Sequence, residues 1–176
     1  MRWVLITTLV CLVAPAASAQ HDHRAAPSPY TALQDREIKA LSAEDVRQLL
    51  EGEGMGMALT AELNGYPGPK HTLEFADSLG LTPAQRARTD SLMQVMQANA
   101  RRLGARLVEA ERALDRTLPG GTVTDPALRE ATAAIGTLRG ELGALHLAAH
   151  LAMREILTPA QVHRYAALRG YGVARF

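Results

Sequence analysis

The pentapeptide Leu-Thr-Pro-Ala-Gln stands at residues 81–85 and again at residues 157–161. Each copy has the residues of a helix start. Thr82 and Thr158 are predicted N-caps, a proline fills the first helical position, and Gln85 and Gln161 stand where a capping-box amide reaches back to the cap. The 76 residues that separate the copies are enough for a long helix, a turn and a long return helix. The repeat therefore predicts a helical hairpin.

The segment between the two copies has the pattern of two long helices. The first is predicted from Pro83 to Leu118, about 54 Å at 1.5 Å per residue, with a bend at Gly104 and a stop at Pro119-Gly120-Gly121. The return helix is predicted to begin at Asp125-Pro126, with Asp125 as its N-cap. Its apolar residues alternate spacings of three and four, as a coiled-coil-like seam requires: Leu128, Ala131, Ile135, Leu138, Leu142, Leu145, Ala149, Ala152 and Ile156.

Shorter helices are predicted on either side of this hairpin. Pro29 opens one that ends near Leu41, and Ser42 with Asp45 begins another that runs through Leu50. Glycines limit residues 55–63 to one short helix, and the remaining two are predicted at 69–78 and 162–168. No run of alternating β-branched residues is present, so the fold class is expected to be all-α.

The N-terminus reads as a secretory signal peptide over residues 1–19. Arg2 supplies the positive end, residues 4–13 the apolar region, and Ala17-Ser18-Ala19 the cleavage site before Gln20. The apolar run is about half of the ~20 residues that a membrane span needs. We therefore expect cleavage after Ala19, a disordered leader over residues 20–28, and one helical domain over residues 29–176.

Composition excludes several classes of function. The single cysteine, Cys11, lies inside the signal peptide, so disulfides and thiol chemistry are not expected. Loss of Arg2 leaves 18 basic and 18 acidic residues, and a neutral chain does not favour nucleic-acid binding. There is no glycine-rich phosphate loop and no His-Glu-x-x-His motif. The chain is not expected to be an enzyme.

Two Leu-Thr-x-x-Gln motifs behind an export signal resemble a family of small periplasmic proteins that includes Spy, CpxP, ZraP and CnrX. The residues that carry the resemblance are Leu81, Thr82, Gln85, Leu157, Thr158 and Gln161. For Spy-like members the resemblance implies interleaved dimers and a helical cradle that holds unfolded chains without ATP. It assigns client binding in this chain to Arg101, Arg102 and Arg106, because arginine combines an apolar stem with a charged fork.

The return helix carries no charged residue between Glu141 and Arg154, so more than one of its sides should be covered. A second side of the helix, away from the seam, carries a stripe of small residues that ends at the larger Leu147: Gly136, Gly140 and Gly143. Either the N-terminal helices or a second copy of the chain is predicted to pack there. We favour a homodimer, as the family resemblance implies.

His146, His150 and Met153 follow at i, i+4 and i+7 on this helix and project from one side of it. Two imidazoles one turn apart can bind a divalent metal, and a thioether adds preference for a soft ion such as copper. The resemblance to CnrX implies a further histidine and carboxylate from an earlier helix, for which His71 and Glu74 are the candidates. The alternative is that all five are ordinary packing residues.

Two other clusters have the same two interpretations. Met55 and Met57, beside Gly54 and Gly56, are either a copper contact or apolar filling. His21 and His23 behind the predicted cleavage site either capture metal loosely or belong to a leader without function.

The sequence therefore leaves three functions open, all in the periplasm. The first is an ATP-independent chaperone or envelope-stress adaptor, which binds unfolded or envelope proteins and needs no cofactor. The second is a metal-responsive sensor or resistance protein that binds copper, zinc or a similar ion and acts on a membrane-bound sensor partner. The third is a structural subunit of the envelope.

Overall fold

The computed structural model describes residues 28–171, so the predicted signal peptide and all but the last residue of the predicted leader lie outside it. The chain divides into two units, Met1–Ala32 and Leu33–Phe176. In the described part of the first unit, the amide and hydroxyl of Thr31 donate to the Ser28 carbonyl. Across the described residues every regular element is helical and no strand forms, which confirms the all-α prediction.

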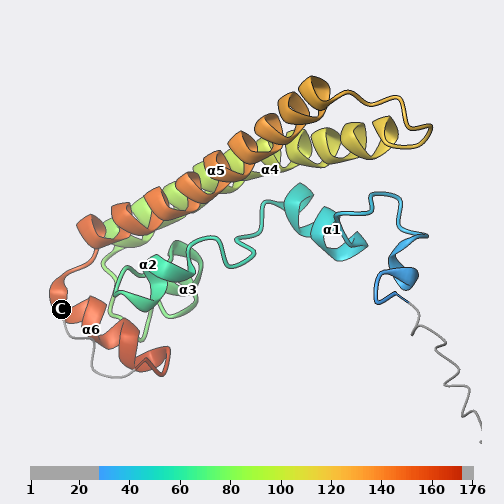
Figure 1. Ribbon diagram of the computed structural model, residues 1–176. Helices are drawn as coiled ribbons and strands as arrows, with labels where there is room; N and C mark the ends of the chain where they lie inside the picture. The colour runs from blue at the N-terminus through green and yellow to red at the C-terminus, as the bar shows by residue number, and fades with distance from the viewer. Residues whose placement is uncertain (1–27, 172–176) are drawn as a thin grey trace, which may run out of the picture. The chain divides into compact units, whose positions relative to one another are not determined.

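The hairpin consists of α4 (Pro83–Thr117) and α5 (Asp125–Ile156), which run antiparallel and side by side (Figure 1). Both helices have nearly the predicted bounds. The N-cap of α5 is one residue earlier than predicted, because the Thr124 hydroxyl accepts from the Ala127 amide. Asp125 instead sits in the first turn, where it binds Arg129 at 2.8 Å. Within residues 28–171, no helix combines the length and the apolarity that a membrane crossing requires.

The two pentapeptides meet at one end of this hairpin. As predicted, Thr82 and Thr158 cap α4 and α6 (Pro159–Leu168), and each is closed into a capping box by its glutamine. The two glutamine amides also bind each other: Gln85 Nε2 donates to Gln161 Oε1 at 2.8 Å, and Gln161 Nε2 donates to Gln85 Oε1 at 3.1 Å. Gln85 Nε2 further donates to the Ile156 carbonyl at 2.9 Å. The repeat thus joins the start of α4 to the end of α5.

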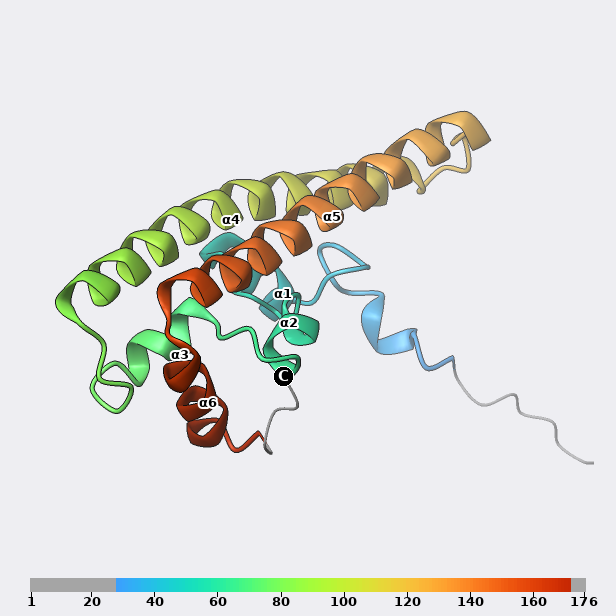
Figure 2. The ribbon, with the colours of Figure 1, turned by 90° about the vertical axis from the view of Figure 1, so that its left-hand side faces the viewer.

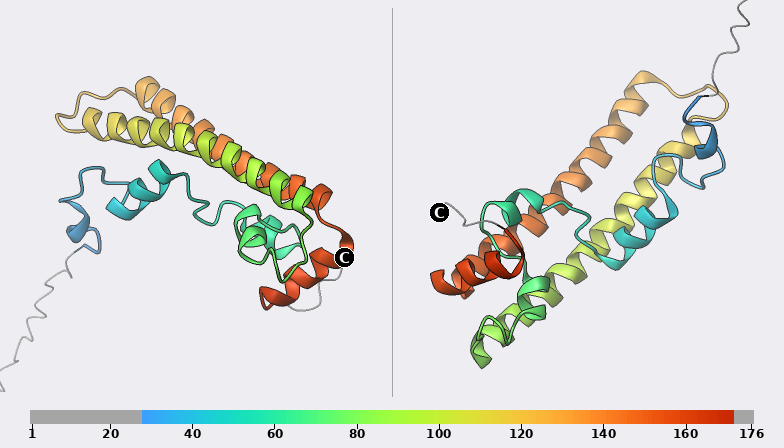
Figure 3. Two further views of the ribbon diagram at one scale, coloured as in Figure 1. Left: turned by 180° about the vertical axis from the view of Figure 1, so that it is seen from behind. Right: turned by 90° about the horizontal axis from the view of Figure 1, so that it is seen from below.

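The remaining helices lie on one side of the hairpin (Figures 2 and 3). They are α1 (Ala43–Glu51), α2 (Leu59–Leu63) and α3 (Pro69–Glu74), together with α6. α1 begins at the predicted Ser42 cap with Asp45 closing the box, whereas α3 ends four residues earlier than predicted.

The predicted helix over residues 29–41 is wrong, because only a 3-10 turn, η1 (Thr31–Leu33), and irregular chain are present. Ile38 and Leu41 are the buried apolar residues of this stretch, and Tyr30 is exposed. Burial of only two side chains is too little to offset the cost of forming a helix. Ile38 and Leu41 therefore reach the core from a segment without regular structure.

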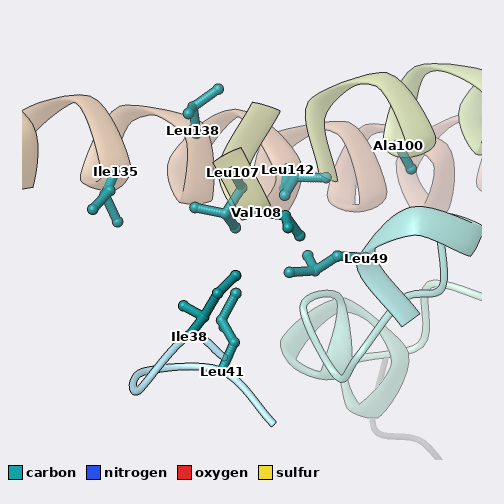
Figure 4. Close-up of a cluster of buried hydrophobic side chains, with 9 residues drawn as sticks. All are labelled: Ile38, Leu41, Leu49, Ala100, Leu107, Val108, Ile135, Leu138 and Leu142. Carbon is teal, nitrogen blue, oxygen red and sulfur yellow. The ribbon is translucent and has the colours of Figure 1, made fainter. Parts of the chain in front are cut away.

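Nine buried residues form the main core between α4, α5 and the N-terminal segment (Figure 4): Ile38, Leu41, Leu49, Ala100, Leu107, Val108, Ile135, Leu138 and Leu142. A second cluster, Met153, Ile156, Leu157 and Val162, lies at the motif end. α4 is assigned as one continuous helix through Gly104, where a bend was predicted. A Cβ at Gly104 would stand 2.1 Å from the Leu49 carbonyl oxygen, so this glycine admits the end of α1.

The outer face of α5 is uncovered by the described part of the chain. An added Cβ at Gly136, Gly140 or Gly143 would meet no atom within 4 Å among the described residues. The short helices therefore do not pack on this stripe. Leu151 continues it and is 56% exposed.

Candidate metal centre

A pocket of about 600 Å³ opens on the side of the short helices. Along α5 it lies between Leu142 of the main core and Met153 of the second cluster. Three groups of side chains line it: imidazoles from His71, His146 and His150; thioethers from Met55, Met93 and Met96; and charged groups from Glu51, Glu53, Glu62, Lys70, Arg101 and Arg169.

His146 is buried in the wall of this pocket, with 4% of its surface exposed. Its Nε2 has no hydrogen-bond partner, and Glu62 Oε2 has none either. Among residues 28–171, these are the two buried side-chain atoms without a partner. Leaving a buried polar atom unpaired is unfavourable, so a ligand that reached either atom would relieve this cost.

Electrostatics keep His146 neutral. Burial, and then the charge of His150, lower the pKa of the His146 imidazole from its ordinary value of 6.5. A neutral imidazole has a lone pair to give to a metal, whereas a protonated one does not.

His150 follows one turn later and is oriented by backbone. Its Nδ1 lies 2.7 Å from the Tyr66 carbonyl oxygen. Because a carbonyl only accepts, Nδ1 carries a proton, so Nε2 is the nitrogen that the neutral ring can offer to a metal. The loop that supplies Tyr66 is itself tied to α5, since Arg154 donates to the Gly65 carbonyl at 2.9 Å. Metal-bound histidines in proteins usually have their second nitrogen fixed in this way.

Glu62, on α2, brings a negative charge to the same place and was missed from the sequence. Its Oε1 accepts from the hydroxyls of Tyr165 and Tyr171 at 2.6 and 3.1 Å and from Arg169 Nε at 3.2 Å. Its Oε2 lies 3.7 Å from His150 Nδ1. Burial foremost, and then the bond to Glu62, raise the pKa of Tyr165, which therefore stays a donor. α2 has five residues, too few for any periodicity to mark Glu62 as inward-facing.

The predicted ligands divide into two groups. His146, His150 and His71 all line the pocket. Met153 is fully buried in the second apolar cluster and does not line it. Glu74 lies outside the pocket wall and accepts from His71 Nδ1 at 2.7 Å, and this hydrogen bond lowers the pKa of Glu74. Glu74 thus orients His71.

In the part of the chain that the structure describes, no three His, Cys, Asp or Glu side chains converge closely enough to hold a metal by themselves. Of the two methionines singled out in the sequence, Met55 lines the pocket, while both Met55 and Met57 pack against the main core. The pocket histidines and Glu62 therefore do not form a ready three-ligand group among residues 28–171.

The three arginines predicted to bind clients all lie on α4 and have different partners. Arg101 lies at the pocket rim and donates to the Glu51 carbonyl at 3.1 Å. Arg102 donates to Asn99 on its own helix, and Arg106 lies 3.9 Å from Glu141 on α5.

A separate shallow groove of about 370 Å³ lies between α4 and α5, near the motif end. Its lining is largely apolar with one charge of each sign: Arg88, Ser91, Leu92, Val95, Ala152, Glu155 and Ile156. Val95 is 59% exposed there.

Comparison with known proteins identifies a family. The family model described as heavy-metal resistance matches residues 54–164, more than half of the chain, and spans the hairpin and the three pocket histidines. No curated protein and no solved structure matches the chain. The family match agrees with the resemblance drawn from the two motifs. This chain belongs to the heavy-metal resistance family.

Proposed function

We propose that this protein binds a copper or zinc ion in the periplasm as part of a metal-resistance or metal-sensing response. The observation that carries the proposal is the pair of unpartnered buried atoms in one pocket, His146 Nε2 and Glu62 Oε2. Imidazole nitrogen suits both ions, and a carboxylate beside it offsets their charge.

The chain's own residues would act as follows. His146 and His150 supply lone pairs from adjacent turns of α5, and His71 stands at the pocket edge with its tautomer fixed by Glu74. Glu62 supplies negative charge from α2. A bound ion would supply a positive charge between Glu62 of α2 and the histidines of α5.

Signalling would follow from the partners of Glu62. Its other oxygen already binds Tyr165 and Arg169, so a change at the pocket reaches α6 and the residue that follows it. An ion that binds one arrangement of these helices more tightly shifts the population toward it. A membrane-bound sensor that recognises α6 would detect the change.

Calorimetric titration with Zn²⁺ and with Cu²⁺ tests this function. We expect a dissociation constant below about 1 μM for at least one ion, and a loss of about 100-fold or more in the variant His146→Ala/His150→Ala. His163→Ala, at an exposed position on α6, is the matched control and should bind as the wild type does. Equal affinity in the double variant and the wild type would refute the proposal, and so would the absence of binding by the wild type.

A second function, holding unfolded proteins, is supported by the groove between α4 and α5. Exposed Val95 and the neighbouring Arg88 offer an apolar surface beside a positive charge, which suits apolar and acidic segments of a client. The protein should then suppress aggregation of a reduced client in the presence of a chelator. Val95→Asp should abolish that effect while leaving metal affinity unchanged. Suppression that is unaffected by Val95→Asp would exclude the groove.

We also propose that the protein is a homodimer and is not an enzyme. The exposed stripe from Gly136 to Leu151 gives a second copy a flat, partly apolar face on which to pack. Neither metal binding nor client holding requires a bond to be made or broken.

A further inference from the structure

Three methionines line the pocket. Met55 enters from the chain between α1 and α2, and Met93 and Met96 stand one turn apart on α4. His146 lines the same pocket from α5, and its Nε2 has no partner. Three methionines and a histidine with an unpartnered nitrogen therefore line one pocket.

The chain that carries Met55 passes directly over the His146 ring. A Cβ at Gly54 would stand 3.9 Å from His146 Nδ1, which is van der Waals contact. Met55 itself has a φ of 44°, the one positive value among the non-glycine residues from 28 to 171. A side chain rarely adopts this conformation, so the surrounding contacts hold Met55 in place.

The methionines of α4 are members of neither apolar cluster, whereas Met153 is wholly inside the second. Met96 is buried and Met93 is partly buried, and both line the pocket.

This set of donors discriminates between metals. Zinc sites in proteins use three or four nitrogen, oxygen or thiolate ligands, and no such group of three converges here. Thioethers bind soft ions, and methionine selects monovalent copper. A soft monovalent ion also requires less compensating charge, and Glu62 is the one carboxylate of the pocket that is buried.

Resting on the proposed metal-binding function, we infer that the ligand of this pocket is a soft monovalent ion, Cu(I), held by His146 together with Met55, Met93 and Met96. His150 and Glu62 complete the opposite wall. The inference assigns these three methionines as specificity-determining residues: they set which metal binds, and the histidines set whether metal binds at all.

Silver provides the test, because Ag⁺ has the charge and softness of Cu(I) without its redox chemistry. The wild type should bind Ag⁺ more tightly than Zn²⁺ in calorimetric titrations. Met93→Leu/Met96→Leu replaces two thioethers with side chains of similar volume, a swap that cores tolerate. It should weaken Ag⁺ binding at least tenfold and change Zn²⁺ binding by less than about twofold. Met153→Leu is the matched control and should change neither.

A second readout does not depend on any substitution. In protein labelled with ¹³C at the methionine methyl groups, Ag⁺ should shift the resonances of Met55, Met93 and Met96 and leave that of Met153 in place. Unshifted methyl resonances, or equal Ag⁺ affinity in the wild type and the double leucine variant, would overturn the inference. Either result would leave the proposed function standing if His146→Ala/His150→Ala still abolishes binding of Zn²⁺ or Cu²⁺. If that variant binds every ion as the wild type does, the proposed function itself fails.

Discussion

Single residues decide how much room the pocket leaves around its histidines. Gly68 is buried beside His150, and an added Cβ there would stand 3.0 Å from Cε1 and 3.1 Å from Nε2 of that ring. The glycine thus leaves room beside Nε2, the nitrogen of His150 that is proposed to bind metal, without itself providing a ligand.

Gly68→Ala should therefore weaken metal binding although every ligand remains. The methyl group crowds His150 Nε2, and the ring must move by a few tenths of an ångström. We expect about a tenfold loss of affinity, or about 1.4 kcal/mol, by calorimetry. Gly136→Ala adds the same methyl group on the outer face of α5, where it meets no described atom, and should bind normally. Equal affinity in all three proteins would contradict this role.

The buried His146 also predicts how the metal-free protein responds to pH. Its pKa is lowered in the folded state, so the unfolded chain binds the proton more readily. Stability is fully present above the unfolded pKa of 6.5 and declines as the pH falls from there toward the lower folded value. Urea unfolding at about pH 7.5 and about pH 5.5, with a chelator present, measures the decline. His146→Leu should show a smaller decline, and an identical decline in both proteins would exclude His146 as its source.

Among the helices, the sequence predicts where a helix begins better than it predicts which residues the helix contacts. The caps Ser42, Thr82 and Thr158 are local chemistry, and each begins its helix as predicted. The helix over residues 29–41 failed because its two buried side chains, Ile38 and Leu41, are held by distant α4 and α5, which no local pattern reveals. Glu62 was missed for the same reason: its partners, Tyr165 and Arg169, lie about a hundred residues away.

Long-range packing also explains Gly104. Its local sequence indicates a residue that weakens the helix, whereas in the structure it makes room for α1. Gly104→Ala would force its methyl group into the Leu49 carbonyl of α1 and should destabilise the protein by about 1–3 kcal/mol. Gly136→Ala, made in the Leu151→Arg background that should keep the chain monomeric, has open space beside it and should instead stabilise by up to about 1 kcal/mol. Urea unfolding of both variants measures the difference. A stabilised Gly104→Ala would show that α1 does not pack there.

The two hydrogen bonds between the side-chain amides of Gln85 and Gln161 predict that the stability effects of mutating these residues are coupled. If Gln85 and Gln161 acted only as local caps, the effects of Gln85→Ala and Gln161→Ala would add. Because their amides bind each other twice, the double variant should be less destabilised than the sum by about 0.5–3 kcal/mol. A double-mutant cycle by chemical denaturation measures this energy. If the two changes in the free energy of unfolding add strictly, the hydrogen bonds between the two glutamines contribute nothing to stability.

At the scale of the whole molecule, the uncovered stripe of α5 predicts association. Light scattering on the purified protein at tens of micromolar should give the mass of a dimer. Leu151→Arg places a charge on the exposed stripe and should yield monomers. Thr60→Arg, at an exposed position on the side of the short helices, should leave the dimer intact. A wild-type protein that is monomeric at this concentration would show that the homodimer prediction is wrong.

The proposed function places one metal ion in the pocket, bound by His146 and His150. The most direct measurement is NMR of the imidazole nitrogens in ¹⁵N-histidine-labelled protein, recorded as Ag⁺ or Zn²⁺ is added. The account predicts large shifts of Nε2 in His146 and His150, with His163 unchanged. Shifts confined to His21 and His23 of the N-terminal segment, or no shift at all, would contradict it.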